Sequence, residues 1–422
     1  MAESGASHGI ARTSGVRSEE QRQKDLERID KYRQLEDEVR QHVAKQKFSS
    51  PEVFQLTSKL LRLNPEYYTV WNVRRRCLIS GLFSKQSLGS SCSTESWSSS
   101  RCDTTATSSV ESSSSSLTAT PPSPAPLTAG KSGTTVDEGD ADADAEAEKK
   151  DFDLIKSELY FTIPLLLESP KCYWIWSYRL WVLNQAIERL PAPVARRIWE
   201  EELGLASKML LKDRRNFHAW GYRRHVVAQL ESPALGGGSM VEAEFEYTEK
   251  MFRTDLSNFS ALHNRSQLIP RLLDERGATD AQRKAFLDKE LNMIRDALNV
   301  GPEDQSLWYY HQFLVLNIVT TVGRPTITPA FTLEERISYV SREIEEIKDL
   351  LEDYEDVQLI YEALVDYTLY LSRLEERKPT EEEREDLVSW VGQLKELDPM
   401  RNGRWADLER DQGLVELLPG GQ

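Results

Sequence analysis

Two short motifs contain residues that bind phosphate or divalent cations in other proteins. Residues 130–132 read Gly-Lys-Ser, as at the end of a phosphate-binding loop, but Ala125 stands where the first glycine of that loop is required and no strand precedes it. Asp140, Asp142 and Asp144 supply carboxylates of the kind that hold Mg²⁺ beside a diphosphate. Their alternate spacing in an Ala-rich tract does not fix a ligand geometry. Neither motif therefore predicts a site.

The cysteines and histidines form no metal-binding pattern. The four cysteines lack the short paired spacings of zinc sites and suggest no disulfide framework, which fits a reducing compartment: Cys77, Cys92, Cys102 and Cys172. Three histidines also lack metal-type spacing and are expected to belong to repeated structure: His225, His263 and His311.

A large anchor residue followed three positions later by a basic residue is the strongest pattern in the chain. The anchors are Trp71, Trp176, Trp220, Leu262 and Trp308, with a looser sixth copy at Trp405. The residues three positions later are Arg74, Arg179, Arg223, Arg265 and His311. We expect the arginines to pair with carboxylates or helix C-terminal carbonyls of a neighbouring hairpin, while their stems pack against the tryptophans.

Each copy is predicted to lie on a helix that starts seven positions before its anchor. The predicted capping residues, often followed by proline, are Asn64, Ser169, Asp213, Asp255, Gly301 and Asp398. In four copies an aromatic residue stands three positions before the anchor, at Tyr68, Tyr173, Phe217 and Phe259. In five copies an apolar residue stands seven positions after the anchor. These positions share one helix face, which predicts a packing seam.

A single helix cannot bury such a seam, so a second helix is expected in each repeat. Successive anchors from Trp176 to Trp308 lie 42 to 46 residues apart, which leaves room for it. Residues 195–211, 240–253 and 281–300 have the required helical periodicity. The sequence predicts an all-α fold, an α-solenoid of antiparallel helical hairpin repeats.

The chain has 422 residues and a net charge of −16, which argues against nucleic acid or an anionic membrane as its main partner. No signal peptide or apolar run of about 20 residues is present, so we expect a cytosolic protein. Residues 1–47 are predicted to be an N-terminal segment with an amphipathic first helix, and residues 48–422 one repeat domain. A Ser/Pro-rich and acidic stretch at about 87–149 is predicted to be a disordered insertion, and a degenerate repeat is expected within 333–410.

The sequences of two repeats, residues 169–179 and 213–224, resemble the repeats of the protein prenyltransferase alpha subunit family. Within that family the chain looks like the type II, Rab geranylgeranyltransferase class. Three features favour this class: His8-Gly9 with Arg12 before a charged helix, Phe217 in place of a tyrosine, and the ending at 397–401. Because the chain stops soon after the last repeat, it resembles the short form without immunoglobulin-like and leucine-rich repeat domains.

The resemblance implies a right-handed superhelical crescent around a beta subunit that carries zinc and most of the isoprenoid pocket. Such heterodimers transfer geranylgeranyl from geranylgeranyl diphosphate to C-terminal cysteines of Rab GTPases, which a Rab escort protein presents. By the same resemblance, Lys171 is a cation for the diphosphate, His218 a second donor, and Tyr173 a hydroxyl donor, while Phe217 can only pack. His8 could reach the partner's site.

The residues themselves support a plainer interpretation of this set. Tyr173 and Phe217 occupy the repeated position three before the anchor, so their pattern predicts core packing rather than catalysis. Lys171 lies in a predicted first helical turn, where a cation opposes the helix dipole, and this unfavourable placement favours function. His218 has no counterpart in the other copies.

Two other functions remain open at this point. One is a helical-repeat adaptor of the tetratricopeptide kind, against which the longer period and the Trp-x-x-Arg pattern argue. The other is the alpha subunit shared by farnesyltransferase and type I geranylgeranyltransferase, against which His8-Gly9 and Phe217 argue.

Overall fold

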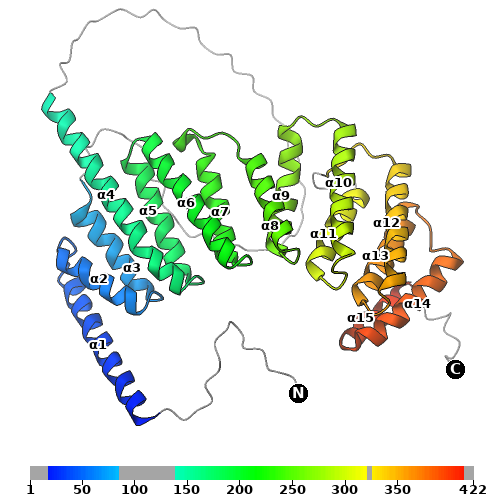
Figure 1. Ribbon diagram of the computed structural model, residues 1–422, viewed down its shortest axis with the longest axis horizontal. Coiled ribbons are helices and arrows are strands. Elements are labelled where there is room, and N and C mark those ends of the chain that lie inside the picture. The colour runs from blue at the N-terminus through cyan, green and yellow to red at the C-terminus, as the bar shows by residue number, and fades with distance from the viewer. Residues whose placement is uncertain (1–17, 85–137, 321–325, 413–422) are drawn as a thin grey trace, which may run out of the picture. The chain divides into compact units, whose positions relative to one another are not determined.

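The computed structural model describes residues 18–84, 138–320 and 326–412 (Figure 1). His8, Gly9, Arg12 and the Gly-Lys-Ser motif at 130–132 lie outside these residues. So does most of the expected insertion, whose last residues, from Glu138 on, belong to helix α4. All regular structure in the described ranges is helical, and no helix there is long and apolar enough to cross a membrane.

The chain divides into two compact units, and the first contains the N-terminal helices. It comprises residues 1–163 and 184–190. Its helices are α1 (Glu19–Ala44), α2 (Pro51–Leu63) and α3 (Tyr68–Cys77), the π-helical turn η2 (Leu78–Leu82), most of α4 (Glu138–Glu168) and the end of α5 (Tyr173–Arg189). Helix α2 packs against both α1 and α3, and Trp71 on α3 is buried. The predicted first helix is confirmed as α1, but the apolar face expected of it is largely exposed: Val39 is its buried residue, whereas Leu26 and Ile29 are exposed.

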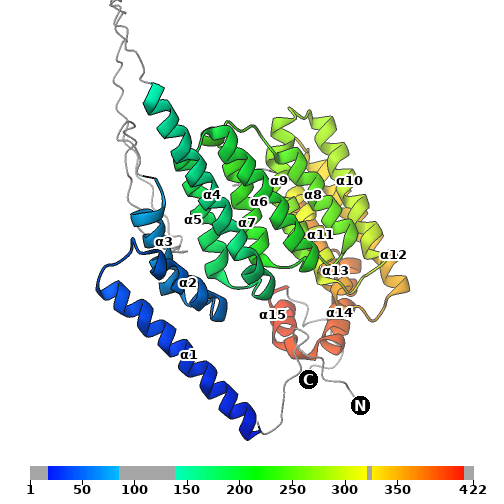
Figure 2. The same ribbon diagram turned by 60° about the vertical axis from the view of Figure 1, so that its left-hand side comes forward.

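The second unit, residues 164–183 and 191–422, is a series of hairpins in chain order (Figures 1 and 2). The helix pairs that pack together are α6 (Ala192–Lys212) with α7 (Phe217–Leu230), α8 (Val241–Thr254) with α9 (Phe259–Glu275), α10 (Asp280–Leu298) with α11 (Gln305–Val319), α12 (Leu333–Asp353) with α13 (Gln358–Leu374), and α14 (Glu381–Leu397) with α15 (Asn402–Gln412). Two short 3₁₀ turns are η3 (Pro233–Leu235) and η4 (Pro399–Arg401). The predicted all-α fold of antiparallel hairpin repeats is confirmed for the described residues.

The predicted capping positions lie three residues before the observed ones in five copies. The predicted capping residue ends the preceding helix or lies in the connection, as Asp213 does at the C-terminus of α6, and α7 begins only at Phe217. A turn intervenes because the amide of Asn216 donates to the carbonyl of Asp213 at 3.1 Å. The cap of α7 is Asn216, whose side chain accepts from the amides of His218 and Ala219. The spacing of this residue from the anchor, repeated from copy to copy within the chain, therefore marks the hairpin turn.

The anchor tryptophans join this turn to the second helix of the hairpin through a hydrogen bond. In four copies the indole N–H donates to the carbonyl six residues earlier: Trp71 to Pro65, Trp176 to Pro170, Trp220 to Arg214 and Trp308 to Pro302, at 2.6 to 2.9 Å. The anchors are buried, so each donor is satisfied while the ring fills the seam. The role of the anchors as buried packing residues is confirmed.

Each repeat arginine joins its hairpin to the next through a buried, two-pronged ion pair. Arg74 pairs with Glu158, Arg179 with Glu202, Arg223 with Glu244 and Arg265 with Glu290, with N–O distances of 2.6 to 2.8 Å. In every case the glutamate lies on the first helix of the following hairpin. The prediction that the arginines pair with carboxylates of a neighbouring hairpin is confirmed.

The degenerate repeat is the α12–α13 hairpin. Tyr361 takes the anchor position there, and its hydroxyl donates to the carbonyl of Glu355, six residues earlier, at 2.9 Å. Glu343 on α12 accepts from His311, the residue that replaces arginine in the fifth copy, at 3.1 Å. Trp405, the looser sixth anchor, is buried on α15.

Candidate functional site

The aromatic residues three positions before the anchors are exposed, so the prediction that they pack in the core is wrong. The exposed fractions are 58% for Tyr173, 69% for Phe217 and 48% for both Tyr68 and Phe259. Each is the first residue of its helix, at the end of a hairpin rather than along its length. Their side chains therefore lie at the edge of the repeats, where a partner or ligand can reach them.

A hydrogen-bonded pair of turns positions the four residues that the resemblance singles out. The carbonyl of Pro170 accepts from the indole of Trp176 at 2.9 Å and from the side-chain amide of Asn216 at 3.1 Å. Asn216 also caps α7 through its side-chain oxygen. One asparagine thus ties the turn that carries Lys171 to the turn that precedes Phe217 and His218.

Aromatic contacts bring three of these side chains together across the two turns. The rings of Tyr173 and His218 lie 6.4 Å apart between centroids, and those of Phe217 and His218 lie 4.0 Å apart. Tyr173 also meets Trp174 edge-on at 5.2 Å. The phenol and the imidazole are therefore neighbours at the surface, with Phe217 packed against the imidazole.

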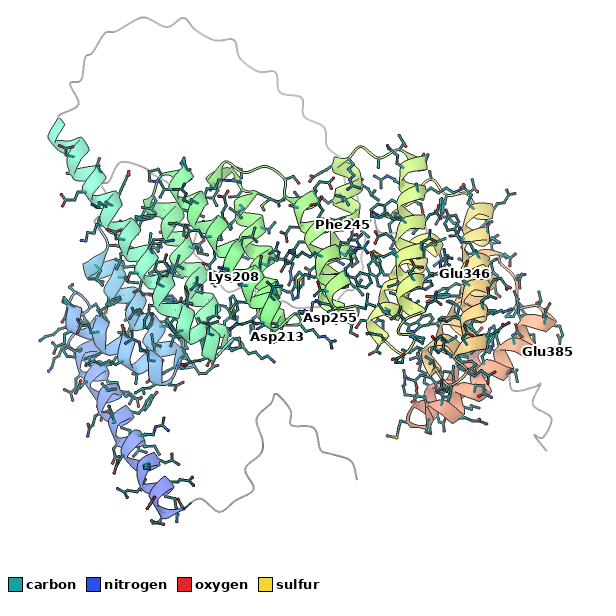
Figure 3. The ribbon with its side chains drawn as sticks, viewed as in Figure 1. Lys208, Asp213, Phe245, Asp255, Glu346 and Glu385 are labelled. Carbon is teal, nitrogen blue, oxygen red and sulfur yellow. The ribbon has the colours of Figure 1, made fainter. Side chains whose placement is uncertain are left out.

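Lys171 is a half-exposed cation beside this aromatic group. Its Nζ lies 3.9 Å from a carboxylate oxygen of Asp213, in the next turn. Arg215 and Asp255 repeat this arrangement one hairpin further on, also at 3.9 Å. Asp213 and Asp255 lie along the same edge of the helices in Figure 3. Ion pairs this long and exposed contribute little to stability, so the lysine is available to an incoming anion.

The arrangement suits binding of an anion rather than a complete reaction. An ammonium, a phenol and an imidazole can all donate hydrogen bonds to phosphate oxygens. Among the described residues, no three histidine, cysteine, aspartate or glutamate side chains are grouped to hold a metal ion. Cys77 and Cys172 are buried. The residues at this edge thus offer contacts to a charged group.

The exposed edge continues beyond the predicted residues. Phe259 meets Tyr309, on the next hairpin, edge-on at a centroid distance of 6.1 Å, and Tyr309 is half exposed. The anchor-based alignment missed Tyr309 because it follows Trp308 directly and has no equivalent in the repeat pattern. A search for aromatic residues in the first five positions of each second helix would have found it.

Comparison with known proteins gives the same repeats. The model of the protein prenyltransferase alpha subunit repeat matches residues 50–80, 155–186, 199–230, 241–272 and 287–318. Each segment contains one of the first five predicted anchors. Geranylgeranyl transferase type-2 subunit alpha of Schizosaccharomyces pombe is 33% identical over 409 residues, which cover 95% of this chain and 97% of that protein. This chain belongs to the geranylgeranyl transferase type-2 alpha subunit family.

Two further similarities extend this result. The type-2 alpha subunit of Bos taurus is 37% identical over 164 residues, which cover 38% of this chain but only 26% of the bovine protein. The structure is similar to a chain of Candida albicans protein geranylgeranyltransferase-I complexed with GGPP, with a TM-score of 0.53, 16% identity, and coverage of 90% of this chain and 89% of that one. This similarity supports the prenyltransferase alpha subunit fold.

Proposed function

We propose that this chain is the alpha subunit of a heterodimeric Rab geranylgeranyltransferase. The enzyme transfers geranylgeranyl from geranylgeranyl diphosphate to C-terminal cysteines of Rab GTPases, which an escort protein presents, and it acts in the cytoplasm. The similarity over nearly the full length of a type-2 alpha subunit carries this proposal. The edge with Lys171, Tyr173 and His218 supports it, because it places a cation and hydrogen-bonding groups at the ends of the hairpins, where a second subunit can reach them.

Lys171, His218 and Tyr173 are proposed to act on the leaving group. Prenyl transfer places negative charge on the departing diphosphate, and donors positioned to meet that charge lower the barrier. In this scheme the ammonium of Lys171 supplies a positive charge. The imidazole of His218 and the hydroxyl of Tyr173 donate hydrogen bonds, while Phe217 holds the imidazole by packing.

The remaining parts of the site are assigned to a beta subunit. Zinc, which holds an attacking cysteine as its thiolate, is expected there. The isoprenoid pocket is also expected on that subunit. Residues 1–47 are proposed to form an N-terminal segment ahead of the repeat domain, and the stretch at about 87–149 an insertion in it.

The test is transfer of geranylgeranyl to a Rab substrate by this chain coexpressed with a type II beta subunit, with and without escort protein. Transfer that depends on both the beta subunit and the escort protein is the expected result. A stable complex without activity, beside an active control enzyme, would favour the shared farnesyltransferase-type subunit. Failure to associate with either type of beta subunit would favour an adaptor.

A further inference from the structure

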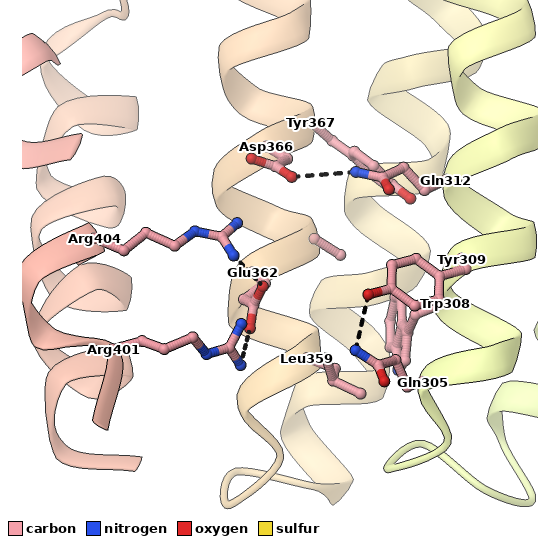
Figure 4. Close-up of a pocket in the computed structure, with 11 residues that line it drawn as sticks. Gln305, Trp308, Tyr309, Gln312, Leu359, Glu362, Asp366, Tyr367, Arg401 and Arg404 are labelled. Carbon is pink, nitrogen blue, oxygen red and sulfur yellow. Dashed lines mark hydrogen bonds and ion pairs between the residues drawn. The ribbon is translucent and has the colours of Figure 1, made fainter. Parts of the chain in front are cut away.

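A polar groove lies where the last three hairpins meet, at the starts of α11, α13 and α15 (Figure 4). Its volume is about 120 Å³. Its apolar surface comes from Trp308, Leu359 and Ala363. Its polar groups come from four elements: Gln305, Tyr309 and Gln312 on α11, Glu362 and Asp366 on α13, Arg401 in η4 and Arg404 on α15.

The two carboxylates of this groove differ in their cationic partners. Glu362 has two cations, Arg401 at 3.0 Å and Arg404 at 3.5 Å. Asp366 accepts only an amide hydrogen bond from Gln312 at 3.3 Å, and no cation in the described ranges forms an ion pair with it. Half-buried carboxylates are normally paired, so Asp366 has room for a positively charged partner.

The titration of Asp366 agrees with this geometry. Burial raises the pKa of Asp366, and the nearby charge of Glu362 raises it further, while Arg404 and Arg373 lower it only in part. An additional cation at the carboxylate would offset the cost of burying its charge.

The groove is continuous with the edge that carries the proposed site. Gln305 is the first residue of α11, in the position that Tyr173 and Phe217 hold in α5 and α7. Tyr309, on the rim, contacts Phe259 of the preceding hairpin. A subunit that covers Lys171 and Phe217 along this edge would therefore also meet the groove.

We propose that this groove binds a lysine or arginine side chain of the prenyltransferase beta subunit, with Asp366 as the acceptor. The proposal rests on the proposed function, which supplies that partner. The C-terminal residues of this chain, 413–422, contain no lysine or arginine and cannot fill the role. A cation at a half-buried carboxylate, beside aromatic and apolar side chains, has the features of an interface hot spot.

The first test measures the affinity of the purified chain for a type II beta subunit by calorimetry. Asp366→Asn should weaken association by about tenfold, and Asp366→Lys should weaken it more, because it places two cations together. Glu385→Lys is the matched control on the exposed face of α14, labelled in Figure 3, and should leave affinity unchanged. Wild-type affinity in both Asp366 variants would overturn the proposal.

The second test identifies the occupant without disturbing Asp366. A photoreactive phenylalanine analogue at Tyr309 should cross-link to a beta-subunit segment that contains lysine or arginine, and reversing that charge should restore binding to Asp366→Lys. A cross-link to another segment of this chain, such as the one with Arg12 and Arg17, would overturn it. If the wild-type chain supports escort-dependent transfer and the Asp366 variants bind the beta subunit with wild-type affinity, only the proposal for the groove is refuted. If the wild-type chain does not bind the beta subunit, the proposed function is refuted as well.

Discussion

Replacing Arg265 with methionine should destabilise the central hairpins strongly, because it leaves Glu290 buried without its cation. Arg265 and Glu290 are 1% and 0% exposed, and two N–O contacts of 2.7 and 2.6 Å join them. Burial alone lowers the pKa of Arg265, but the hydrogen bonds and charge of Glu290 raise it above its usual value. Removing one partner of a buried pair costs about 3 to 5 kcal/mol.

A double-mutant cycle separates this charge effect from lost packing. The guanidinium of Arg265 lies 3.7 Å from the ring centroid of Phe245, a contact that methionine partly retains. In Arg265→Met/Glu290→Gln the uncompensated charge is gone, and the amide oxygen can still accept from Tyr310, which donates to Glu290 at 2.6 Å. The double variant should therefore recover at least about 2 kcal/mol of the loss.

Native-state hydrogen exchange across α9–α11 is the assay, because a repeat protein can open locally. The control is Arg253→Ala, which removes an exposed pair with Glu249 on α8 and should cost no more than about 0.5 kcal/mol. A double variant as unstable as the single one would show that packing, not charge, explains the loss.

Three further predictions concern the site, the anchors and the groove. Lys171→Ala should lower single-turnover transfer by roughly ten- to a hundredfold while leaving assembly intact, with Lys208→Ala as control; unchanged turnover would remove Lys171 from the reaction. Trp220→Ala should lower the free energy of unfolding by about 3 to 5 kcal/mol, since the ring is 2% exposed, and an unchanged melting temperature would contradict its core role. Asp366→Asn should raise the free energy of unfolding of the isolated chain near neutral pH, because the raised pKa of Asp366 means that ionisation of its carboxyl opposes folding. This added stability should disappear in acid, where the wild-type carboxyl is protonated as well. Chemical denaturation at several pH values is the measurement, and added stability that does not change with pH would contradict the prediction.

The sequence could predict the repeats because anchors and arginines are strong side-chain patterns, but it did not reveal their glutamate partners. Glu158, Glu202, Glu244, Glu290 and Glu343 each stand 18 positions before the anchor of their own hairpin, the last being Tyr361. Glutamate is common on exposed helix faces, so this regularity emerges only once the anchor spacing is used to align first helices as well as second ones.

The helix starts were misplaced because asparagine and aspartate, which cap the starts of helices, can also stand at the end of the preceding helix, as Asn64 does for α2 and Asp213 for α6. Asn64 and Asp213 have the residue type of an N-cap, yet the turn formed after each carries the carbonyl that accepts from the anchor indole. That long-range hydrogen bond depends on the tertiary arrangement, which local preferences do not contain. The same three-residue shift decides the site, since it moves Tyr173 and Phe217 from inside a helix to its first position.

The division between scaffold and site follows from this shift. Each second helix begins about one turn later than predicted. Its anchor and arginine still lie within the helix and pack in the seam, but the aromatic residue three positions before the anchor becomes the first residue of the helix and lies at the exposed edge. The arginines, although they are the most regular cations in the chain, are consumed by buried pairs with the next hairpin, as Arg223 is by Glu244. Cations proposed to meet a diphosphate must therefore come from positions outside the seam, in the turns, where Lys171 and its counterpart in the next hairpin, Arg215, lie. Exposure at the turn and at the first position of the second helix, rather than burial in the seam, is what makes a residue of this fold accessible to a ligand or partner.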